Sequence, residues 1–562
     1  MRLARAVTLL AVPAALLALA AGAAAQTFTV SNVANAGAGS LRAAVEASNA
    51  AAGPDTIVFT PGLGGTIQLS GNGLTIKESL TIEGPADGQI PIEQTTPGHR
   101  VFAVSPMALP GAVTFIGLGI FGGQWITGGG DIDAYEANAA VTIERCALLG
   151  ASTEGEPEYG GALVARGEPL IVRDSEFAHD EAGSGGAIWA GGGAGDTVTI
   201  ENSTFYDDTA AWNDGGAILL GVSEGGQSQI TGSSFIDDHS ADRAGAFFIS
   251  AVEGSLVRVA NSTFTGNAAA HTGGAIVATG SDLSATIDGS TIVGNRVTEG
   301  GGKGGGGMYT YHPQPLIDTI VADNSAALAP DLGGEWVTAF DLIGNPAGGE
   351  LTETAPGSDL LGAEPQLGPP ADNGGPTETM APAVTSPAVN KGGGSVTTDQ
   401  RGAPRPVIYP GAALSSAPGA NGADIGAVEL QAPSASGGPA PTTGNPPPPP
   451  PAPGPPAKAA PRVRLSCPNS ARPGGCRFAL EIVSAKPRHV KGKGGRSHLV
   501  APTPESALVT VKVAPGKSAL VTLTPKAKFA ARLTAASTLL VRQVETVKGE
   551  KTTSYRRLKV VD

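Results

Sequence analysis

Two short motifs return in step through the middle of the chain. Gly-Gly-Ala followed by a large apolar residue occupies residues 160–163, 185–188, 215–218 and 273–276, and looser copies end at Phe247 and Tyr309. A second motif has an apolar residue that recurs after 28, 30, 29, 28 and 29 residues, at Phe177, Phe205, Phe235, Phe264, Ile292 and Val321. A fixed period of this length is typical of a solenoid, in which each repeat buries its apolar face by stacking on the next.

The segments between the motifs alternate apolar and polar residues, as in residues 197–201 (Thr-Val-Thr-Ile-Glu), which is the period of a half-buried strand. Glycine, at 82 of 562 residues, favours tight turns over helices. The sequence therefore predicts an all-β chain folded as a parallel β-helix, with one repeat per coil and coils stacked at about 4.8 Å. One interior column is expected to run from Phe177 to Val321, and the other to contain Leu163, Ile188, Ile218, Phe247, Ile276 and Tyr309.

The ends of such a stack expose strand edges and need caps. Ser40 is typical of a helix N-cap and predicts a short helix through Leu41, Val45 and Ser48, with Gly53 just past its end. Residues 29–59 around this helix resemble the opening of many secreted bacterial β-helix proteins.

The paired repeats, with intact copies at residues 264–267 and 273–276, resemble those of the polymorphic outer membrane protein repeat family over about residues 110–325. The resemblance implies a right-handed parallel β-helix that is displayed on or released from the cell surface, with a role in adhesion. Four later blocks resemble the choice-of-anchor Q segment that follows such helices, at residues 372–379, 386–390, 398–402 and 424–429.

Residues 1–25 have the form of a secretory signal peptide, with Arg2 and Arg5 ahead of an apolar run and three alanines before Gln26. We therefore expect a secreted bacterial protein, extracellular or at the cell surface, with no transmembrane segment in the mature chain. The β-helix with its N-terminal cap is expected at 26–364 and the choice-of-anchor-like segment at 365–430. A Pro-rich linker at 431–461 and a basic β-sandwich domain at 462–562 follow.

Charge divides the chain at the linker. Residues 462–562 carry 20 Lys and Arg against 5 Asp and Glu, whereas residues 1–461 carry 16 against 45. Lys491, Lys493 and Arg496 gather in an expected loop, and they are candidates for binding anionic polymers. The alternative is a solvated charged surface. Aromatic residues do not interleave with these charges, so no specific nucleic-acid partner is expected.

The three cysteines of the chain have different expected roles. Cys467 and Cys476 can close a small disulfide loop in an oxidising environment. Cys146 lies inside a repeat and is expected to be a buried thiol.

An acid or amide follows the apolar residue of the second motif by three positions, at Asp180, Asp208, Asp238, Asn267, Asn295 and Asn324. Equivalent turns of neighbouring coils would bring such carboxylates to about 5 Å. Three interpretations follow. Asp207, Asp208, Asp237 and Asp238 could supply an acid and base pair, or Asp180, Asp208 and Asp238 a calcium site. We expect the third, in which Asp replaces a turn-capping Asn and its charge faces solvent.

Two classes of function remain, and neither calls for an organic cofactor or for zinc. The first is a non-catalytic protein of adhesion or of glycan or envelope binding, with extracellular glycans, envelope polymers, or a host or neighbouring-cell surface as partner. The alternative is a secreted glycosidase or lyase that uses the stacked carboxylates. Such an enzyme should gather acids and aromatic sugar platforms in one groove, whereas this sequence spreads its acids along turns and disperses its four tryptophans. The sequence favours the first class.

Overall fold

The computed structural model describes residues 24–432, apart from residues 52, 87, 109, 154–158, 194–196, 253, 281–282 and 301. Beyond the linker it describes the backbones of eight strands between Arg462 and Lys559. The chain divides into two compact units, Met1–Pro433 and Ser434–Asp562. Nearly all of the expected signal peptide lies outside the described residues.

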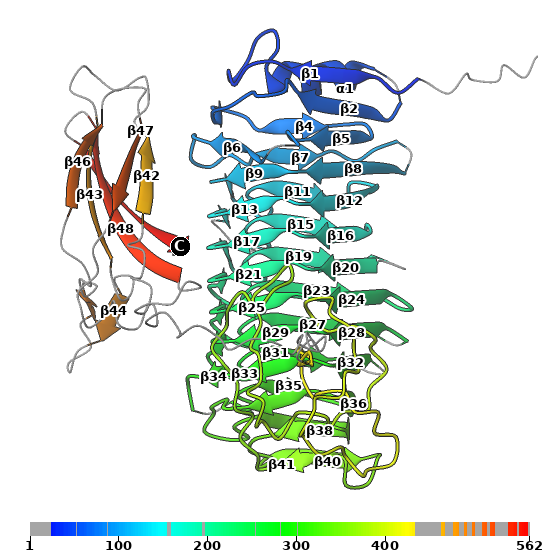
Figure 1. Cartoon of the computed structure of the whole chain (residues 1–562). Helices are drawn as coiled ribbons and strands as arrows, with labels where there is room; N and C mark the ends of the chain where they lie inside the picture. The colour runs from blue at the N-terminus through cyan, green and yellow to red at the C-terminus, as the bar shows by residue number, and fades with distance from the viewer. Residues whose placement is uncertain are drawn as a thin grey trace, which may run out of the picture. The chain divides into compact units, whose positions relative to one another are not determined.

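The first unit is a parallel β-solenoid of about 10 turns over residues 27–322, as the repeat period predicted (Figure 1). From β11 (Ile132–Tyr135) to β34 (Arg296–Val297) each coil takes a strand from sheet C, then sheet A, sheet B and the narrow sheet D. All pairings within these sheets are parallel.

Sheet A contains β1 (Thr27–Val30), β2 (Asp55–Phe59), β5 (Leu80–Glu83), β8 (Gly111–Ile116), β12 (Ala139–Glu144), β16 (Leu170–Arg173), β20 (Thr197–Glu201), β24 (Gln227–Thr231), β28 (Leu256–Ala260), β32 (Ser284–Asp288), β36 (Gln314–Ile317), β38 (Leu332–Ala339) and β40 (Gly349–Glu353). Sheet B contains β3 (Ile67–Leu69), β6 (Ile90–Gln94), β9 (Leu118–Phe121), β13 (Ala147–Leu149), β17 (Glu176–Ala178), β21 (Thr204–Tyr206), β25 (Ser234–Ile236), β29 (Thr263–Thr265), β33 (Thr291–Val293), β37 (Ile320–Ala322), β39 (Leu342–Ile343) and β41 (Leu360–Leu361).

Sheet C contains β4 (Leu74–Ile76), β7 (Phe102–Val104), β11 (Ile132–Tyr135), β15 (Leu163–Arg166), β19 (Ile188–Gly191), β23 (Ile218–Val222), β27 (Phe247–Ala251), β31 (Ile276–Thr279), β35 (Met308–Thr310) and the start of β38. Sheet D contains β10 (Gln124–Trp125), β14 (Ser152–Thr153), β18 (Glu181–Ala182), β22 (Thr209–Ala210), β26 (His239–Ser240), β30 (Ala268–Ala269) and β34 (Arg296–Val297).

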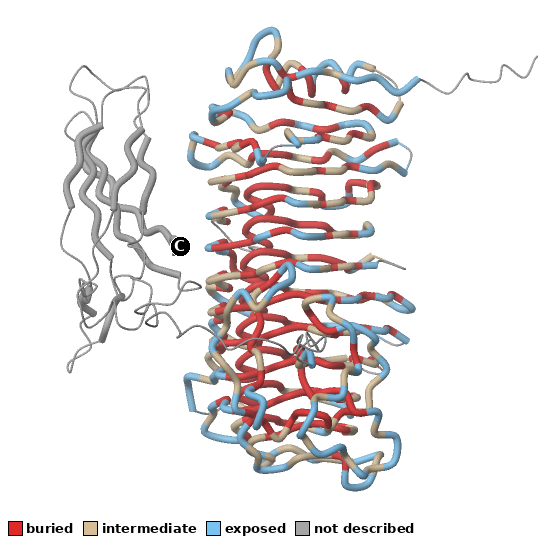
Figure 2. Tube along the Cα trace, viewed as in Figure 1, coloured by how far each residue is buried: buried red, intermediate tan, exposed pale blue. Residues whose placement is uncertain are grey.

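The predicted column from Phe177 to Val321 is confirmed. Its six residues are partners in consecutive pairings of sheet B, and all are fully buried. Phe205, Phe235 and Phe264 stack with their rings nearly parallel, at centroid separations of 4.7 and 4.5 Å. Figure 2 shows the interior of the stack as an almost continuous series of buried strands.

The second predicted column is correct except at its last member. Leu163, Ile188, Ile218, Phe247 and Ile276 follow one another in register, but Ile276 pairs with Met308, and Tyr309 pairs with Val277. In this repeat a third glycine, Gly307, replaces the alanine of the motif, so the apolar position is Met308. Because side chains alternate along a strand, the one-residue difference moves Tyr309 to the outer face.

The glycines of the first motif are required by the turn into sheet C. Gly185 has φ of +60°, which is the left-handed region. A Cβ on the next residue, Gly186, would lie 2.2 Å from the carbonyl oxygen of Gly216 in the following coil. The backbones of successive coils therefore approach too closely at this corner for any side chain.

The N-terminal cap follows the sequence prediction. Helix α1 spans Leu41–Ala50, and the Oγ of its N-cap, Ser40, accepts a hydrogen bond from the amide of Ala43 at 3.2 Å. Its buried residues Leu41, Val45 and Ser48 face the first coil, so the helix covers the end of the apolar core.

Cys146 is a free, buried thiol, as expected. It occupies the turn position that serines fill in the later coils: the amide of Cys146 donates to Ser175 Oγ, and the amide of Ser175 donates to Ser203 Oγ. Burial raises the pKa of the Cys146 thiol to about 11, so the group is a neutral part of the core.

After β41 the chain folds back along the outer face of sheet B. This returning segment, residues 365–432, is joined to the coils by side-chain hydrogen bonds: Thr263 Oγ1 donates to Gln400 Oε1 at 2.6 Å, and Asn261 Nδ2 donates to the Thr398 carbonyl at 2.9 Å. Its anchor is Arg405, a fully buried cation within 3.6 Å of Asp318 and Glu429. The sequence did not predict where this segment would lie.

The second unit contains β42 (Arg462–Ser466), β43 (Cys476–Ile482), β44 (Arg488–Lys491), β45 (Ser497–Val500), β46 (Val509–Val513), β47 (Ser518–Thr522), β48 (Thr538–Val547) and β49 (Glu550–Lys559). All of its pairings are antiparallel, and the largest sheet has the order β46-β43-β48-β49. Cys467 lies outside the described residues, so the Cys467–Cys476 disulfide stays a prediction.

Candidate functional site

The structure corrects the expected orientation of the turn aspartates. Asp180, Asp208 and Asp238 were expected to face solvent, but each is fully buried. In a solenoid each turn is stacked between the turns of the preceding and following coils. The side chain of a turn residue can therefore point inward and bond the backbone amides of the preceding coil. The hydrogen bonds agree with the other part of the prediction, that Asp and Asn cap equivalent turns.

These caps form one continuous ladder. Oδ1 of Asp180, Asp208 and Asp238 accepts a backbone amide of the preceding coil, at 2.8, 2.9 and 3.0 Å. The ladder continues through Asn267, Asn295 and Asn324, whose Oδ1 atoms do the same at 2.9 to 3.0 Å. Burial raises the pKa of all three aspartates well above the usual range, and neighbouring carboxylates contribute.

Asp208 and Asp238 are therefore not placed to meet a substrate, because a general acid or base must come within hydrogen-bonding reach of the reacting group. The solvent-facing candidates are their neighbours Asp207 and Asp237, which precede them in the left-handed conformation. The side chain of Asp207 is 28% exposed, and its Oδ2 lies 2.9 Å from His179 Nδ1. Its Oδ1 lies 4.0 Å from Nε2 of His239.

The calcium alternative gains no support from this arrangement. Among the described residues, no group of three or more Asp, Glu, His or Cys side chains is placed to hold a metal ion. Of the basic candidates in the second unit, Lys491 ends β44, while Lys493 and Arg496 lie outside the described residues.

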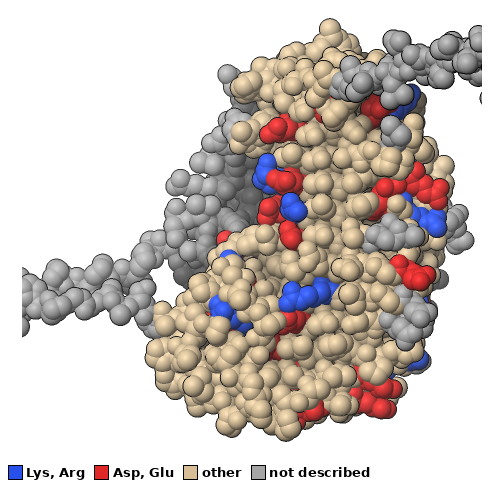
Figure 3. All heavy atoms as spheres, turned by 90° about the vertical axis from the view of Figure 1, so that its right-hand side faces the viewer, with Lys and Arg blue, Asp and Glu red and all other residues tan. Residues whose placement is uncertain are grey.

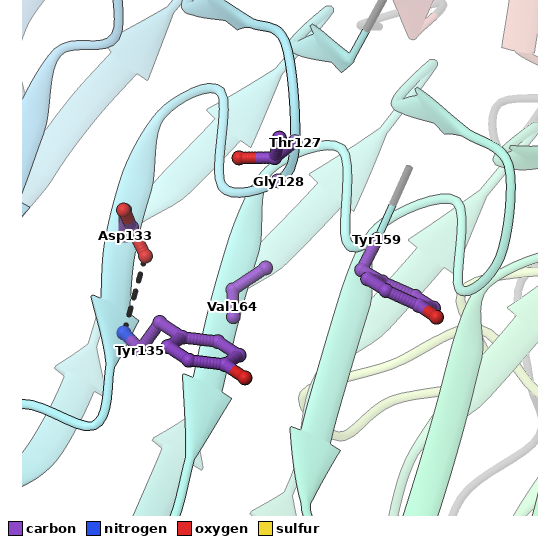
Figure 4. A pocket seen from close by; sticks show the side chains of 6 residues that line it. All are labelled: Thr127, Gly128, Asp133, Tyr135, Tyr159 and Val164. Atoms are coloured by element: carbon purple, nitrogen blue, oxygen red, sulfur yellow. Dashed lines mark hydrogen bonds between the residues drawn. The ribbon is translucent and has the colours of Figure 1, made fainter. Parts of the chain in front are cut away.

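A cluster of aromatic side chains that was not predicted from the sequence lies on the outer face of sheet C. The ring of Trp189 on β19 stacks against Tyr159 at a centroid separation of 4.8 Å, and against Tyr135 of β11 at 6.2 Å. Beside them is a pocket of about 360 Å³ lined by Thr127, Gly128, Asp133, Tyr135, Tyr159 and Val164. Figure 4 shows Val164 between the two tyrosine rings, with Asp133 at the edge.

Two arginines frame this aromatic cluster. Arg166 lies over the rings of Tyr135 and Trp189, with its guanidinium carbon 5.1 and 5.8 Å from the centroids, and it bonds the hydroxyl of Tyr135. Arg100 lies 4.3 Å from the Trp125 centroid and pairs with Asp133. The cluster thus combines stacked rings, of which Tyr135 is exposed and Tyr159 and Trp189 are partly buried, with charged hydrogen-bonding groups at its rim.

A second aromatic cluster lies further along the same face. Lys303 Nζ is 4.2 Å from the ring centroid of Tyr311 and 5.5 Å from that of Tyr309. Within the described part of the chain this ammonium makes no ion pair. Trp189 and Tyr309 occupy one outward column of sheet C and are four coils apart, about 19 Å at the usual strand spacing.

The residues between the clusters are apolar: Leu219, Phe248 and Val277 complete the column. The signal was present in the sequence, since each of these residues directly follows the apolar residue of the first motif. Phe248 and Val277 are nevertheless buried: with Ala244 they form a small second core, against which Leu219 and Tyr309 pack.

The neighbouring face of the solenoid differs. In Figure 3 acidic and basic side chains lie in small mixed groups between broad uncharged areas. This view shows no large area of a single charge sign.

Comparison with known proteins assigns no family: no protein-family model and no curated protein sequence matches this chain. Among the described residues, no helix is long and apolar enough to cross a membrane.

Proposed function

We propose that this protein is an exported, non-catalytic β-solenoid that binds extracellular glycans through the outer face of sheet C. The observation that carries the proposal is the stack of Tyr135, Trp189 and Tyr159 beside a pocket with polar groups at its rim. Exposed aromatic rings offer an apolar face to the C–H groups of a sugar ring, while charged and hydroxyl groups at the edge accept and donate hydrogen bonds.

Two finer points belong to the same proposal. The repeat resemblance supports a right-handed coil and display on, or release from, a bacterial surface. The net positive charge of residues 462–562, on a Pro-rich spacer, supports attraction to anionic envelope polymers, with Lys491, Lys493 and Arg496 among the contributing charges.

The geometry favours binding over hydrolysis. A glycosidase needs two carboxyl groups on either side of the scissile bond. Among the residues that the structure describes, one carboxylate lines the pocket, that of Asp133, and it is paired with Arg100. Asp207 and Asp237 belong to the turn between sheets B and D, away from the residues that line the pocket.

Trp189→Ala is expected to weaken glycan binding by about tenfold or more, which corresponds to about 1.4 kcal/mol, because Trp189 contacts both tyrosine rings. A glycan array probed with the mature full-length protein would identify a ligand, and titration calorimetry with that ligand would compare the variants. Tyr206→Ala, which removes an aromatic ring from sheet B, is the control and should bind as the wild type does.

Equal affinity of Trp189→Ala and wild type would contradict the proposed site. If the wild type shortens the bound glycan and Asp207→Asn abolishes this cleavage while folding normally, the enzyme alternative is correct.

A further inference from the structure

The six caps of the turn ladder are geometrically equivalent but chemically different. Asp180, Asp208 and Asp238 fill the first three positions and Asn267, Asn295 and Asn324 the next three. In each case Oδ1 accepts an amide from the preceding coil. The pairing of Phe205, Phe235 and Phe264 keeps these coils in one register.

The asparagines use their second polar atom as a donor. Asn267 Nδ2 donates to Asn295 Oδ1 at 2.9 Å and to the carbonyl oxygen of Phe235 at 3.1 Å. Asn295 Nδ2 and Asn324 Nδ2 repeat both bonds one and two coils further on. The last acceptor is Asp331, whose two carboxylate oxygens receive three N–H donors from Asn324 and Asn345.

The aspartates have an oxygen, Oδ2, where the asparagines have that donor nitrogen. In Asp180, Asp208 and Asp238 this atom is buried and has no hydrogen-bond partner. By the equivalence of the coils, Oδ2 of Asp238 faces Oδ1 of Asn267 and the carbonyl of Phe205, which are both acceptors. An unprotonated oxygen there would face two acceptors, whereas a proton on Oδ2 would supply the missing donor.

The other charged groups do not relieve this arrangement. Burial raises the pKa of all three carboxyls, and the charges that raise it further come from other acids. The titratable groups around the three aspartates are Asp131, Glu176, His179, Asp207, Asp237 and His239. The basic groups in this region include the two histidines, which lie beside Asp207, and Arg296, which acts on His239.

We propose that Asp180, Asp208 and Asp238 are uncharged carboxylic acids in the folded protein, each acting as an asparagine substitute that donates from Oδ2, so that proton binding stabilises the solenoid. The unfolded chain would hold these carboxyls at an ordinary aspartate pKa of about 3.9. Their stabilisation is therefore complete below about pH 4. It is lost as the pH rises through their higher folded pKa, because the folded chain then binds more protons than the unfolded one.

The test is thermal unfolding of the mature full-length protein and of Asp180→Asn/Asp208→Asn/Asp238→Asn between pH 6 and pH 9. The variant should melt at a higher temperature than the wild type. The difference between the two melting temperatures should increase by about 5 °C or more from pH 6 to pH 9. Asp174→Asn/Glu224→Gln, which removes two exposed carboxyls of the same solenoid that do not act on the ladder, is the control and should keep a constant offset.

The proposal would be overturned if the difference in melting temperature between the triple variant and wild type did not change with pH. It would also be overturned if the control showed the same increase in that difference. Infrared spectroscopy is the second readout. At pH 7 the wild type should show the carbonyl band of protonated carboxyl groups, and the single variant Asp208→Asn should show it reduced. Melting is repeated with calcium and with a chelator, because a calcium-dependent rise that the triple variant loses would show that the carboxyls are ionised metal ligands instead.

Discussion

Replacing Phe235 with alanine is expected to lower the free energy of unfolding of the solenoid by about 3 to 5 kcal/mol. The ring is fully buried and lies between Phe205 and Phe264, with interplanar angles of 5° and 1°. Neighbouring coils hold both rings in place through the parallel pairing of sheet B, so the cavity cannot collapse without moving strands. Denaturant unfolding followed by circular dichroism would measure the loss.

Leu256→Ala is the control, because Leu256 is an apolar residue of a solenoid strand but is 50% exposed. Its truncation should change the stability by less than about 0.5 kcal/mol. A comparably small effect of Phe235→Ala would mean that the aromatic column does not form the core.

The fold could be predicted because the strand period and the repeat period act together. Within a strand, alternation determines which residues point inward, and a spacing near 29 residues places those positions above one another, as for Phe205 and Phe235. The error at Tyr309 arose where the motif itself changes, because a run of glycines carries no alternation that would identify the inward residue.

The orientation of Asp208 could not be obtained in the same way. A polar residue in an isolated turn ordinarily faces water. In a stack of turns, the backbone amides of the neighbouring turn lie next to the residue and need a hydrogen-bond acceptor. The Asn at equivalent positions identified a cap but not its direction. The direction of the cap side chain depends on the contact between coils, and the sequence of a single repeat does not contain that contact.

The proposed glycan site could be predicted only in part. Trp189 follows the apolar residue of its motif, so an outward position could be inferred. Tyr159 lies outside the strands, and its contact with Trp189 depends on the path of a turn. The docking of residues 365–432 on sheet B was beyond prediction, because it depends on individual contacts such as Gln400 with Ser234 and Thr263.

Arg405→Met is expected to weaken the attachment of this returning segment by about 3 to 5 kcal/mol, because it leaves buried acids without their cation. Arg405 Nη2 lies 3.6 Å from Asp318 Oδ2, Nε lies 3.6 Å from Glu429 Oε2, and Nη1 donates to the Gly426 carbonyl at 2.7 Å. Asp318 in turn accepts the amides of Gly393 and Gly394. Hydrogen exchange at these two glycines and limited proteolysis would report the detachment.

The effect of Arg405→Met should grow with pH. Burial raises the pKa of Asp318 to about 6 and that of Glu429 to about 7 even beside the arginine, and removal of the cation raises both further. Because the folded values exceed the unfolded ones, the attachment is strongest below about pH 4 and weakens as the pH rises through the folded pKa values. Cleavage of the variant should therefore be faster at pH 8 than at pH 5.

Arg173→Met is the control, since Arg173 pairs with Glu201 at 3.2 Å and both side chains are partly exposed, at 45% and 34%. A pair of that kind contributes about 0 to 1 kcal/mol. Exchange at Gly393 and Gly394 that is as slow in Arg405→Met as in wild type at pH 8 would show that the charge network does not hold the segment in place, leaving polar contacts such as those of Gln400 as its attachment.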